Sequence, residues 1–329
     1  MLSIAVIGAG RIGQIHAHNV AANPRARLAG IADLDAAAAA RLAQACGAQV
    51  ISLQFAFEAD AVMICSPTAT HADLIERAAA ARRPVFCEKP IDLSAPRVRL
   101  CLMAVRRARI PLMVGFNRRF DPHFASLKRR LDAGEIGRLE LLTIISRDPA
   151  PPPPAYIATS GGLFRDMMIH DLDMARFLLG EEPVEVFAAA SVLVDPAIGA
   201  AGDVDTAVVT LRTAGGALCQ ISNSRRASYG YDQRIEAHGA TGLLRAGNVT
   251  ATTVELATGA GFTTEPALPF FLERYAAAYR AELEAFITAV TNSTPPHPDG
   301  EDGLRALLLA DAATQSARTH QPVTPSGEM

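Results

Sequence analysis

The sequence predicts an α/β protein in two parts: an N-terminal doubly wound parallel sheet, then a C-terminal α/β domain with a large, mostly antiparallel open sheet. Three observations predict this architecture. An apolar run at 3–7 leads into a glycine-rich turn and a helical segment. Strand-like and helix-like segments then alternate as far as residue 116. From residue 184 to residue 256, strand-like segments follow one another with glycine-containing turns between them.

The glycine-rich turn has the spacing G-x-G-x-x-G between a first strand and a helix at 14–22. In that context the first glycine makes a tight turn, the second lets a pyrophosphate approach the backbone, and the third lets helix and strand pack closely. The helix N-terminus adds free N–H groups and a positive dipole end. We therefore expect a Rossmann dinucleotide site built from Gly8, Gly10, Arg11, Ile12 and Gly13.

Asp33 ends the second expected strand, at 27–32, about 20 residues after the last glycine of the turn. A carboxylate there accepts hydrogen bonds from the adenosine ribose hydroxyls and repels a 2′-phosphate. Leu34 follows, so no Arg or Ser is there to bind that phosphate. These features favour NAD over NADP. Taken alone, Asp33 could instead be the N-cap of a helix at 36–45.

Two further expected strands, at 61–65 and 84–87, each end in a polar loop. Ligands of doubly wound sheets bind at the carboxyl ends of the strands. His71 could cap the helix at 72–80 or face the cofactor, and Lys89 could be a surface lysine. The residues expected at the cofactor site from these loops are Ser66, Pro67, Thr68, His71, Glu88 and Lys89. The other elements expected here are a short strand at 50–53, a helix at 96–107 and a strand at 111–116.

The composition changes near residue 120, which sets the expected boundary between a domain at 1–120 and a domain at 121–303. The run of prolines at 149–154 predicts a stiff extended loop. A last apolar helix at 304–318 is expected to pack back on the first domain. The elements expected in the second half are helices at 123–133 and 270–290 and strands at 139–146, 184–194, 204–212, 217–224, 230–238, 243–246 and 249–256.

Residues 161–180, GGLFRDMMIHDLDMARFLLG, predict one largely buried helix between glycine ends. Three polar residues interrupt its apolar surface: Asp166, His170 and Asp173, spaced so that they share one face. A carboxylate one turn from an imidazole fixes its tautomer and favours its cation, as a general base requires. The alternatives are a solvated surface pair and, ranked lower because no third ligand follows with recognisable spacing, a metal site. The sequence predicts no metal.

Composition excludes several classes of protein. The chain has 329 residues, half of them hydrophobic, and a net charge of −3. Without a sustained basic run, neither a nucleic acid nor a membrane surface is an expected partner. No signal-peptide pattern or membrane-length apolar run is present. The five cysteines are odd in number and never spaced C-x-x-C, as in a cytoplasmic protein with reduced thiols.

Five motifs together resemble the glucose–fructose oxidoreductase/inositol dehydrogenase/rhizopine catabolism (Gfo/Idh/MocA) family, in order along nearly the whole chain. They are GAGRIG at 8–13, Ser-Pro-Thr-x-x-His at 66–71, Glu-Lys-Pro at 88–90, GFNRRFD at 115–121 and the segment 161–180. Arg-Asp-Pro at 147–149 and YGYDQR at 229–234 look similar to the inositol 2-dehydrogenase branch.

The resemblance implies a catalytic trio of Lys89, Asp166 and His170. It also implies a C-terminal sheet that serves as an oligomer interface, in a homotetramer or a homodimer. Asp148 stands where the resemblance leads us to expect Asn. The substrate contacts that the resemblance suggests, besides this trio, are Arg119, Asp148, Tyr229 and Tyr275.

The expected reaction is NAD-dependent oxidation of a secondary hydroxyl of a cyclic polyol, with myo-inositol to 2-keto-myo-inositol as the first choice. Other inositols and pyranose sugars follow closely. Two alternatives stay open: a sugar or imine reductase or hydride-neutral enzyme of the same family, and a catalytically silent NAD-binding regulatory protein.

Overall fold

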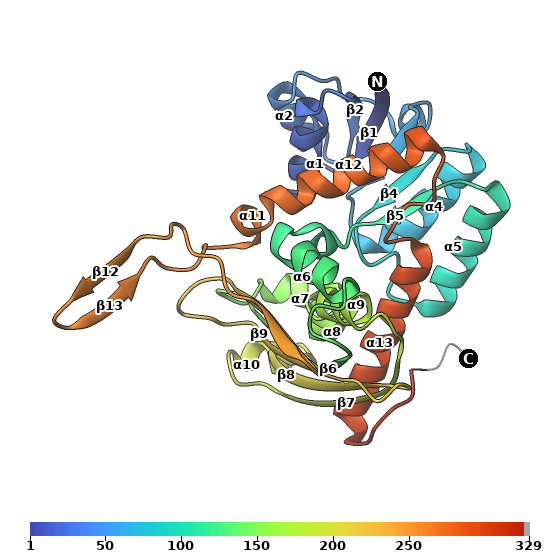
Figure 1. Cartoon of the computed structure of the whole chain (residues 1–329). Helices are drawn as coiled ribbons and strands as arrows, with labels where there is room; N and C mark the ends of the chain where they lie inside the picture. Colours follow the sequence, from blue (N-terminus) through green and yellow to red (C-terminus); the bar gives the residue numbers. More distant parts are fainter. Residues whose placement is uncertain (326–329) are drawn as a thin grey trace. The chain divides into compact units, whose positions relative to one another are not determined.

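The computed structural model describes residues 1–325 (Figure 1). The chain folds into two compact units. Unit 1 comprises Met1–Phe120 and Ala278–Leu307, and unit 2 comprises Asp121–Ala277 and the described residues that follow Leu307, 308–325. Each unit has its own sheet, so the predicted combination of a parallel sheet with a mostly antiparallel one is confirmed.

Unit 1 is built on a five-stranded sheet, ordered β2-β1-β3-β4-β5, in which every neighbouring pair is parallel. The strand order reverses between β1 and β3, which places the ligand-binding crevice of such sheets at the carboxyl ends of these two strands. All the strands except β2 are almost completely buried, as the apolar runs predicted, and β2 is buried mainly in its last three residues. Their bounds are β1 Leu2–Ile7, β2 Ala26–Ala32, β3 Ala61–Ile64, β4 Val85–Cys87 and β5 Leu112–Val114.

Helices cover this sheet, and one of them comes from much later in the chain. Leu283, Phe286 and Ile287 of α12 (Ala276–Asn292) pack in the same core as Ile4 and Val6 of β1. The strand expected at 50–53 is wrong: residue 50 makes only an isolated bridge, and a short helix begins at residue 53. The other helices here are α1 Arg11–Ala22, α2 Ala36–Ala45, α3 Leu53–Ala56, α4 His71–Ala80 and α5 Ala95–Ala108.

Unit 2 contains a six-stranded sheet, ordered β11-β10-β6-β9-β8-β7, that is antiparallel except between β6 and β9. Burial alternates along its strands, so one face is buried while the other is exposed. Four helices lie on one side of it (Figure 1): α6 Pro122–Asp132, α7 Pro154–Ser160, α8 Gly162–Asp166 and α9 Ile169–Leu179. The strands are β6 Leu139–Arg147, β7 Pro183–Ser191, β8 Thr206–Thr213, β9 Leu218–Ser224, β10 Asp232–Gly239 and β11 Gly242–Ala246.

The single helix expected at 161–180 is wrong. The structure has α8, Gly162–Asp166, and α9, Ile169–Leu179, with a break at Met167 and Met168. The N–H groups of both methionines donate to the carbonyl of Leu163, so the chain makes a wider turn than an α-helix at this point. The helices around this pair are α6 Pro122–Asp132, α7 Pro154–Ser160 and α10 Pro196–Ala200.

The end of the chain differs from expectation in two places. The strand expected at 249–256 is replaced by an exposed hairpin, β12 Glu255–Thr258 with β13 Gly261–Thr264. The last helix, α13 (Gly300–Thr319), belongs to unit 1 as far as Leu307 and to unit 2 beyond it. In unit 2, Ser316 Oγ accepts a hydrogen bond from the backbone N–H of Ala188. Among the described residues, no helix has the length and apolarity needed to cross a membrane.

Candidate active site

The glycine turn follows β1 and begins α1. Gly8 has φ +109°, and a Cβ there would lie 2.6 Å from the Cys65 carbonyl carbon. A Cβ on Gly13 would lie 1.9 Å from the Gly8 oxygen, so helix and turn can approach this closely only with glycine. Gly10 is different, because its missing Cβ faces open space and it caps α1 without a side-chain hydrogen bond. The first turn of α1 therefore has room and backbone N–H groups for a pyrophosphate.

Asp33 is tied to this turn and is not a helix cap. Its Oδ2 accepts a 2.5 Å hydrogen bond from Ala9 N–H, and its Oδ1 accepts one of 2.8 Å from Asp35 N–H. The cap of α2 is Asp35, which accepts from the N–H groups of Ala37 and Ala38. The carboxylate of Asp33 is thus exposed at the end of β2 beside the glycine turn, where an adenosine ribose would bind.

The loop after β3 contains the predicted Ser66–Thr68 segment. Ser66 Oγ and Thr70 Oγ1 are 2.6 Å apart and share a hydrogen bond. His71 begins α4 but is only 1% exposed, and its ring nitrogens lie 2.8 Å from Pro90 O and 2.6 Å from Ser66 O. The ring therefore lies between two loops, within hydrogen-bond distance of a carbonyl oxygen of each, and it neither caps the helix nor points to solvent.

The loop after β4 places Lys89 at the same edge of the sheet. Lys89 is half-buried, whereas its neighbours Glu88 and Pro90 are buried. His16 Nε2 lies 2.7 Å from Glu88 Oε1 and 4.0 Å from Glu282 Oε1. His16 and Glu282 were missed by sequence reasoning, because their apolar helices give no sign that they meet Glu88.

Glu282 is fully buried, and neither of its carboxyl oxygens has a hydrogen-bond partner among the described residues. Burial, and then the nearby Glu88, raise the pKa of Glu282 well above its usual value. The three side chains are close enough to share a metal ion. However, His16 Nε2 is already hydrogen-bonded to Glu88, so we interpret the group as a His16–Glu88 hydrogen bond beside the buried Glu282 carboxyl group.

In unit 2, Asp166 ends α8 and is held from two sides. Tyr156 donates its hydroxyl hydrogen to Asp166 Oδ1 at 2.8 Å, and Arg225 Nη1 lies 3.6 Å from Asp166 Oδ2. Arg225 is 1% exposed, and its Nη2 lies 3.5 Å from Asp203. Asp203 also accepts a hydrogen bond from Leu163 N–H at the start of α8. Tyr156, Arg225 and Asp203 were not predicted, since they come from three separate segments.

His170 lies in the first turn of α9 and is half-buried, just beyond the break that follows Asp166. Asp173, predicted on the same face, is buried and lies 3.7 Å from the guanidinium of Arg176. Asp173 therefore has a structural partner, and the pair to consider for chemistry is Asp166 and His170.

The other predicted substrate contacts are in different environments. Tyr229 is half-exposed; it donates to Asp232 at 2.7 Å and accepts from Arg147 at 3.0 Å. Asp148 is half-buried at the end of β6, and its N–H donates to the Ser224 carbonyl.

Two predicted contacts are more enclosed. Tyr275 is 2% exposed and donates to Gln233 Oε1 at 3.2 Å. Arg119, in unit 1, pairs with Asp302 at 3.0 Å.

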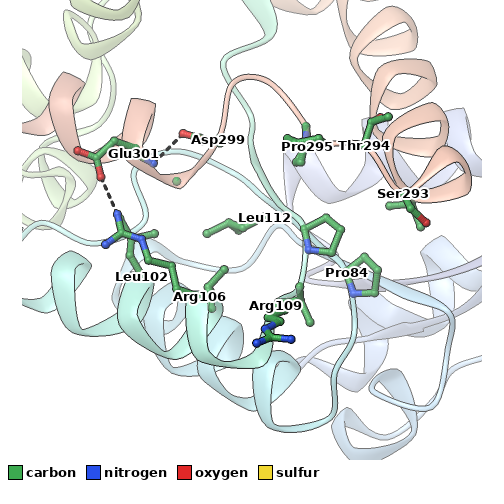
Figure 2. A pocket seen from close by; sticks show the side chains of 16 residues that line it. Pro84, Leu102, Arg106, Arg109, Leu112, Ser293, Thr294, Pro295, Asp299 and Glu301 are labelled. Atoms are coloured by element: carbon green, nitrogen blue, oxygen red, sulfur yellow. Dashed lines mark hydrogen bonds and ion pairs between the residues drawn. The ribbon is translucent and has the colours of Figure 1, made fainter.

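None of these residues lines a pocket of about 530 Å³ in unit 1, part of whose lining is shown in Figure 2. Pro84 and Pro111 line it and directly precede β4 and β5. An ion pair between Arg106 and Glu301, at 3.0 Å, crosses one side of it (Figure 2). The pocket lies at the amino ends of these strands, whereas Lys89 and the glycine turn follow carboxyl ends, so it is not the cofactor crevice.

Comparison with known proteins agrees with both units. Residues 2–116 match an oxidoreductase family described by an NAD-binding Rossmann fold, and residues 124–245 match the GFO/IDH/MocA C-terminal domain. The chain is 54% identical to inositol 2-dehydrogenase of Rhizobium meliloti, over 97% of this chain and 98% of that protein. It is 48% identical to myo-inositol 2-dehydrogenase of Thermotoga maritima, over 98% of each.

Solved structures give the same result. A myo-inositol dehydrogenase from Corynebacterium glutamicum has a TM-score of 0.95 at 48% identity, covering 100% of both chains. The scyllo-inositol dehydrogenase of Lactobacillus casei, crystallised with NAD(H) and scyllo-inositol, has a TM-score of 0.91 at 29% identity, covering 99% of this chain and 99% of that one.

The fold, the glycine turn and these matches define an NAD-binding oxidoreductase with a Rossmann domain. The chain belongs to the GFO/IDH/MocA family. The predicted family, cofactor and class of enzyme are therefore confirmed.

Proposed function

We propose that the protein oxidises myo-inositol at one secondary hydroxyl to 2-keto-myo-inositol, with NAD as the hydride acceptor. The observation that carries this proposal is the 54% identity, over nearly the full length of both chains, to an inositol 2-dehydrogenase. A relative named scyllo-inositol 2-dehydrogenase, at 36% identity, marks the nearest alternative substrate.

The residues of unit 1 suit NAD. The open space at Gly10 and the uncapped start of α1 accommodate a pyrophosphate, and the exposed Asp33 carboxylate suits ribose hydroxyls. Leu34 beside it is 99% exposed and offers no charge to a 2′-phosphate. Bound NAD supplies a nicotinamide ring that takes a hydride from the substrate carbon.

Lys89, Asp166 and His170 have complementary proton chemistry. His170 takes the hydroxyl proton as general base, and Asp166 favours the resulting imidazolium. The Tyr156 and Arg225 contacts support this role, because they orient the Asp166 carboxylate. Lys89 donates a hydrogen bond to the reacting oxygen and stabilises its developing negative charge.

The polyol is recognised by side chains that hydrogen-bond its hydroxyl groups. A site built to hydrogen-bond each substrate hydroxyl rejects an analogue that lacks one, because its own polar groups are then left unpaired. Arg147 and Tyr229, which both contact the buried Asp232, offer such donors and acceptors in unit 2, and Asp148 adds a carboxylate. We assign these residues to substrate selection.

The test is a spectrophotometric assay of NADH formation with a panel of inositols and pyranose sugars, run with NAD and again with NADP. We expect the largest kcat/KM for myo-inositol with NAD. If the protein binds NAD but reduces it with no polyol, the proposal is wrong, and a reductase or a silent NAD-binding regulator takes its place. A hydride-neutral enzyme would convert substrate without net NADH.

We also propose that the protein is a homo-oligomer, assembled through the exposed face of the unit 2 sheet. Apolar side chains on that face are 40–43% exposed. A row of exposed apolar residues across several strands is typical of an interface. The residues, from five of the six strands, are Leu141, Phe187, Val208, Leu218 and Leu243.

A further inference from the structure

The segment Glu88–Lys89–Pro90 is held on both sides of the lysine by buried histidines. His71 Nδ1 lies 2.8 Å from the carbonyl oxygen of Pro90, and His16 Nε2 lies 2.7 Å from Glu88 Oε1. Their side chains are almost wholly buried, at 1% and 0% exposure. The residues immediately before and after Lys89 are therefore anchored to two different helices, α1 and α4.

His71 connects this segment to a second loop of the cofactor crevice. Its other ring nitrogen, Nε2, lies 2.6 Å from the Ser66 carbonyl oxygen at the end of β3. Burial lowers the pKa of His71, although the two carbonyls raise it. A neutral imidazole has one N–H, so it donates to one carbonyl at a time. When the proton is on Nδ1, His71 donates to the carbonyl oxygen of Pro90, the residue that follows Lys89.

His16 fixes the other side through the Glu88 carboxyl group. A Cβ on Gly115 would lie 3.0 Å from Glu88 Cδ, so this carboxyl is packed directly against the backbone after β5. The His16 ring is itself held edge-on by Phe86 and Tyr279, with ring centroids 4.9 and 5.6 Å away. The ring and the carboxyl group are therefore both closely packed.

We propose that His71 and His16 are positioning residues for Lys89, each fixing one flank of the lysine so that its ammonium group reaches the reacting oxygen. The inference rests on the role of Lys89 given under Proposed function. The position of the Lys89 ammonium group depends on the position of the Lys89 backbone. A misplacement of about 1 Å at a reacting group can lower the rate about 100-fold.

Amide substitutions separate positioning from simple destabilisation, because each places an amide nitrogen near the position of one ring nitrogen. The Asn amide nitrogen reaches about as far as imidazole Nδ1, and the Gln amide nitrogen about as far as Nε2. At His71 the bond to Pro90 uses Nδ1, so we expect His71→Gln to lower kcat about tenfold more than His71→Asn. At His16 the bond to Glu88 uses Nε2, so His16→Asn should be the slower variant by a similar factor.

Thermal stability and the Kd for NAD are measured for all four variants. Loss of packing alone should follow the size of the new side chain and so give the same order of kcat at both sites. The same order of Asn and Gln at both histidines, or equal kcat for the pair at each, would overturn the proposal. If one pair does not fold, the order within the other pair decides.

A double-mutant cycle with Lys89→Met identifies the group through which the histidines act. We expect His71→Gln to lower kcat in the wild-type background but not in Lys89→Met, since the positioned group is already absent. Equal losses in both backgrounds would contradict the proposal. If Lys89→Met itself keeps wild-type kcat, the catalytic role of the lysine is wrong as well; a slow Lys89→Met beside an unimpaired His71→Gln would remove the positioning role alone.

Discussion

At the scale of single residues, His170 carries the strongest catalytic prediction. His170→Ala removes the proposed general base, so kcat should fall by about 10²–10⁴-fold. The Kd for NAD should change little, because the glycine turn and Asp33, which suit the pyrophosphate and the ribose, are unchanged. Stopped-flow turnover and a fluorescence titration with NADH measure the two quantities. The control is His18→Ala, because His18 is an exposed histidine on α1. Wild-type turnover in His170→Ala would exclude His170 as the general base.

Asp33 carries the prediction on cofactor choice. Replacing it together with its exposed neighbour, Asp33→Ala with Leu34→Arg, removes the repulsion of a 2′-phosphate and adds a cation for it. The ratio of kcat/KM for NADP to that for NAD should rise at least about tenfold, a change of about 1.4 kcal/mol. Leu34→Arg alone is the control, because Asp33 remains. An unchanged ratio in the double variant would remove Asp33 from the ribose site.

Glu282 makes stability depend on pH. Burial raises the pKa of its carboxyl above the unfolded value of about 4.3, so the folded state binds a proton that the unfolded state releases. This contribution to stability is fully present below the unfolded pKa and is lost as pH rises through the folded pKa. Glu282→Gln keeps the neutral shape, so its free energy of unfolding should fall less steeply with pH above about 4.3.

Urea unfolding across that pH range measures the slope. Glu284→Gln is the matched control, since Glu284 lies on the same helix but is about half exposed and pairs with Arg25. The same pH slope in wild type and Glu282→Gln would show that Glu282 is ionised in the folded protein.

At the level of secondary-structure elements, substitutions in the glycine turn and α1 distinguish an effect on stability from an effect on cofactor binding. Gly13→Ala places a Cβ against the Gly8 oxygen, so it should destabilise the protein by about 3 kcal/mol. Gly10→Ala meets no atom within 4 Å, and its φ of −68° suits alanine, so stability should hold. NAD affinity should nevertheless fall, because the methyl group occupies the space for the pyrophosphate.

Calorimetric titration with NAD and thermal unfolding of both variants give the comparison. Tight NAD binding by Gly10→Ala would mean that the pyrophosphate does not approach this part of the turn.

Elements marked by a pattern of neighbouring residues could be predicted from the sequence. Features that depend on contacts between distant segments could not. The apolar run of β1 and the spacing of Gly8, Gly10 and Gly13 each predict their structure within a few residues. The break between α8 and α9 was missed because Met167 and Met168 are both compatible with a helix. No periodicity marks such a point.

The candidate site was predicted in the same uneven way. Lys89, Asp166 and His170 stand in short motifs, whereas the side chains that hold them come from remote segments. Arg225 and Glu282 are charged residues in buried places, and their partners are far away along the chain. Sequence spacing carries no information about such contacts.

At the scale of the whole molecule, the exposed face of the unit 2 sheet predicts self-association. Val208→Lys places a charge within that face and should shift the protein toward smaller species in light scattering after size-exclusion chromatography. Leu100→Lys is the control, because Leu100 is an equally apolar, exposed residue on α5 of unit 1. An unchanged mass in Val208→Lys, or a monomeric wild type, would contradict assembly through this face.

Isotope transfer can show whether hydride passes from C2 of myo-inositol to NAD. The enzyme is given NAD and myo-inositol deuterated at C2, and the NADH formed is analysed by mass spectrometry. We predict that the deuterium appears in NADH and that kcat/KM is lower for the deuterated substrate whenever hydride transfer limits the rate. NADH formed without deuterium, or deuterium released to solvent, would contradict oxidation at C2 and with it the proposed reaction.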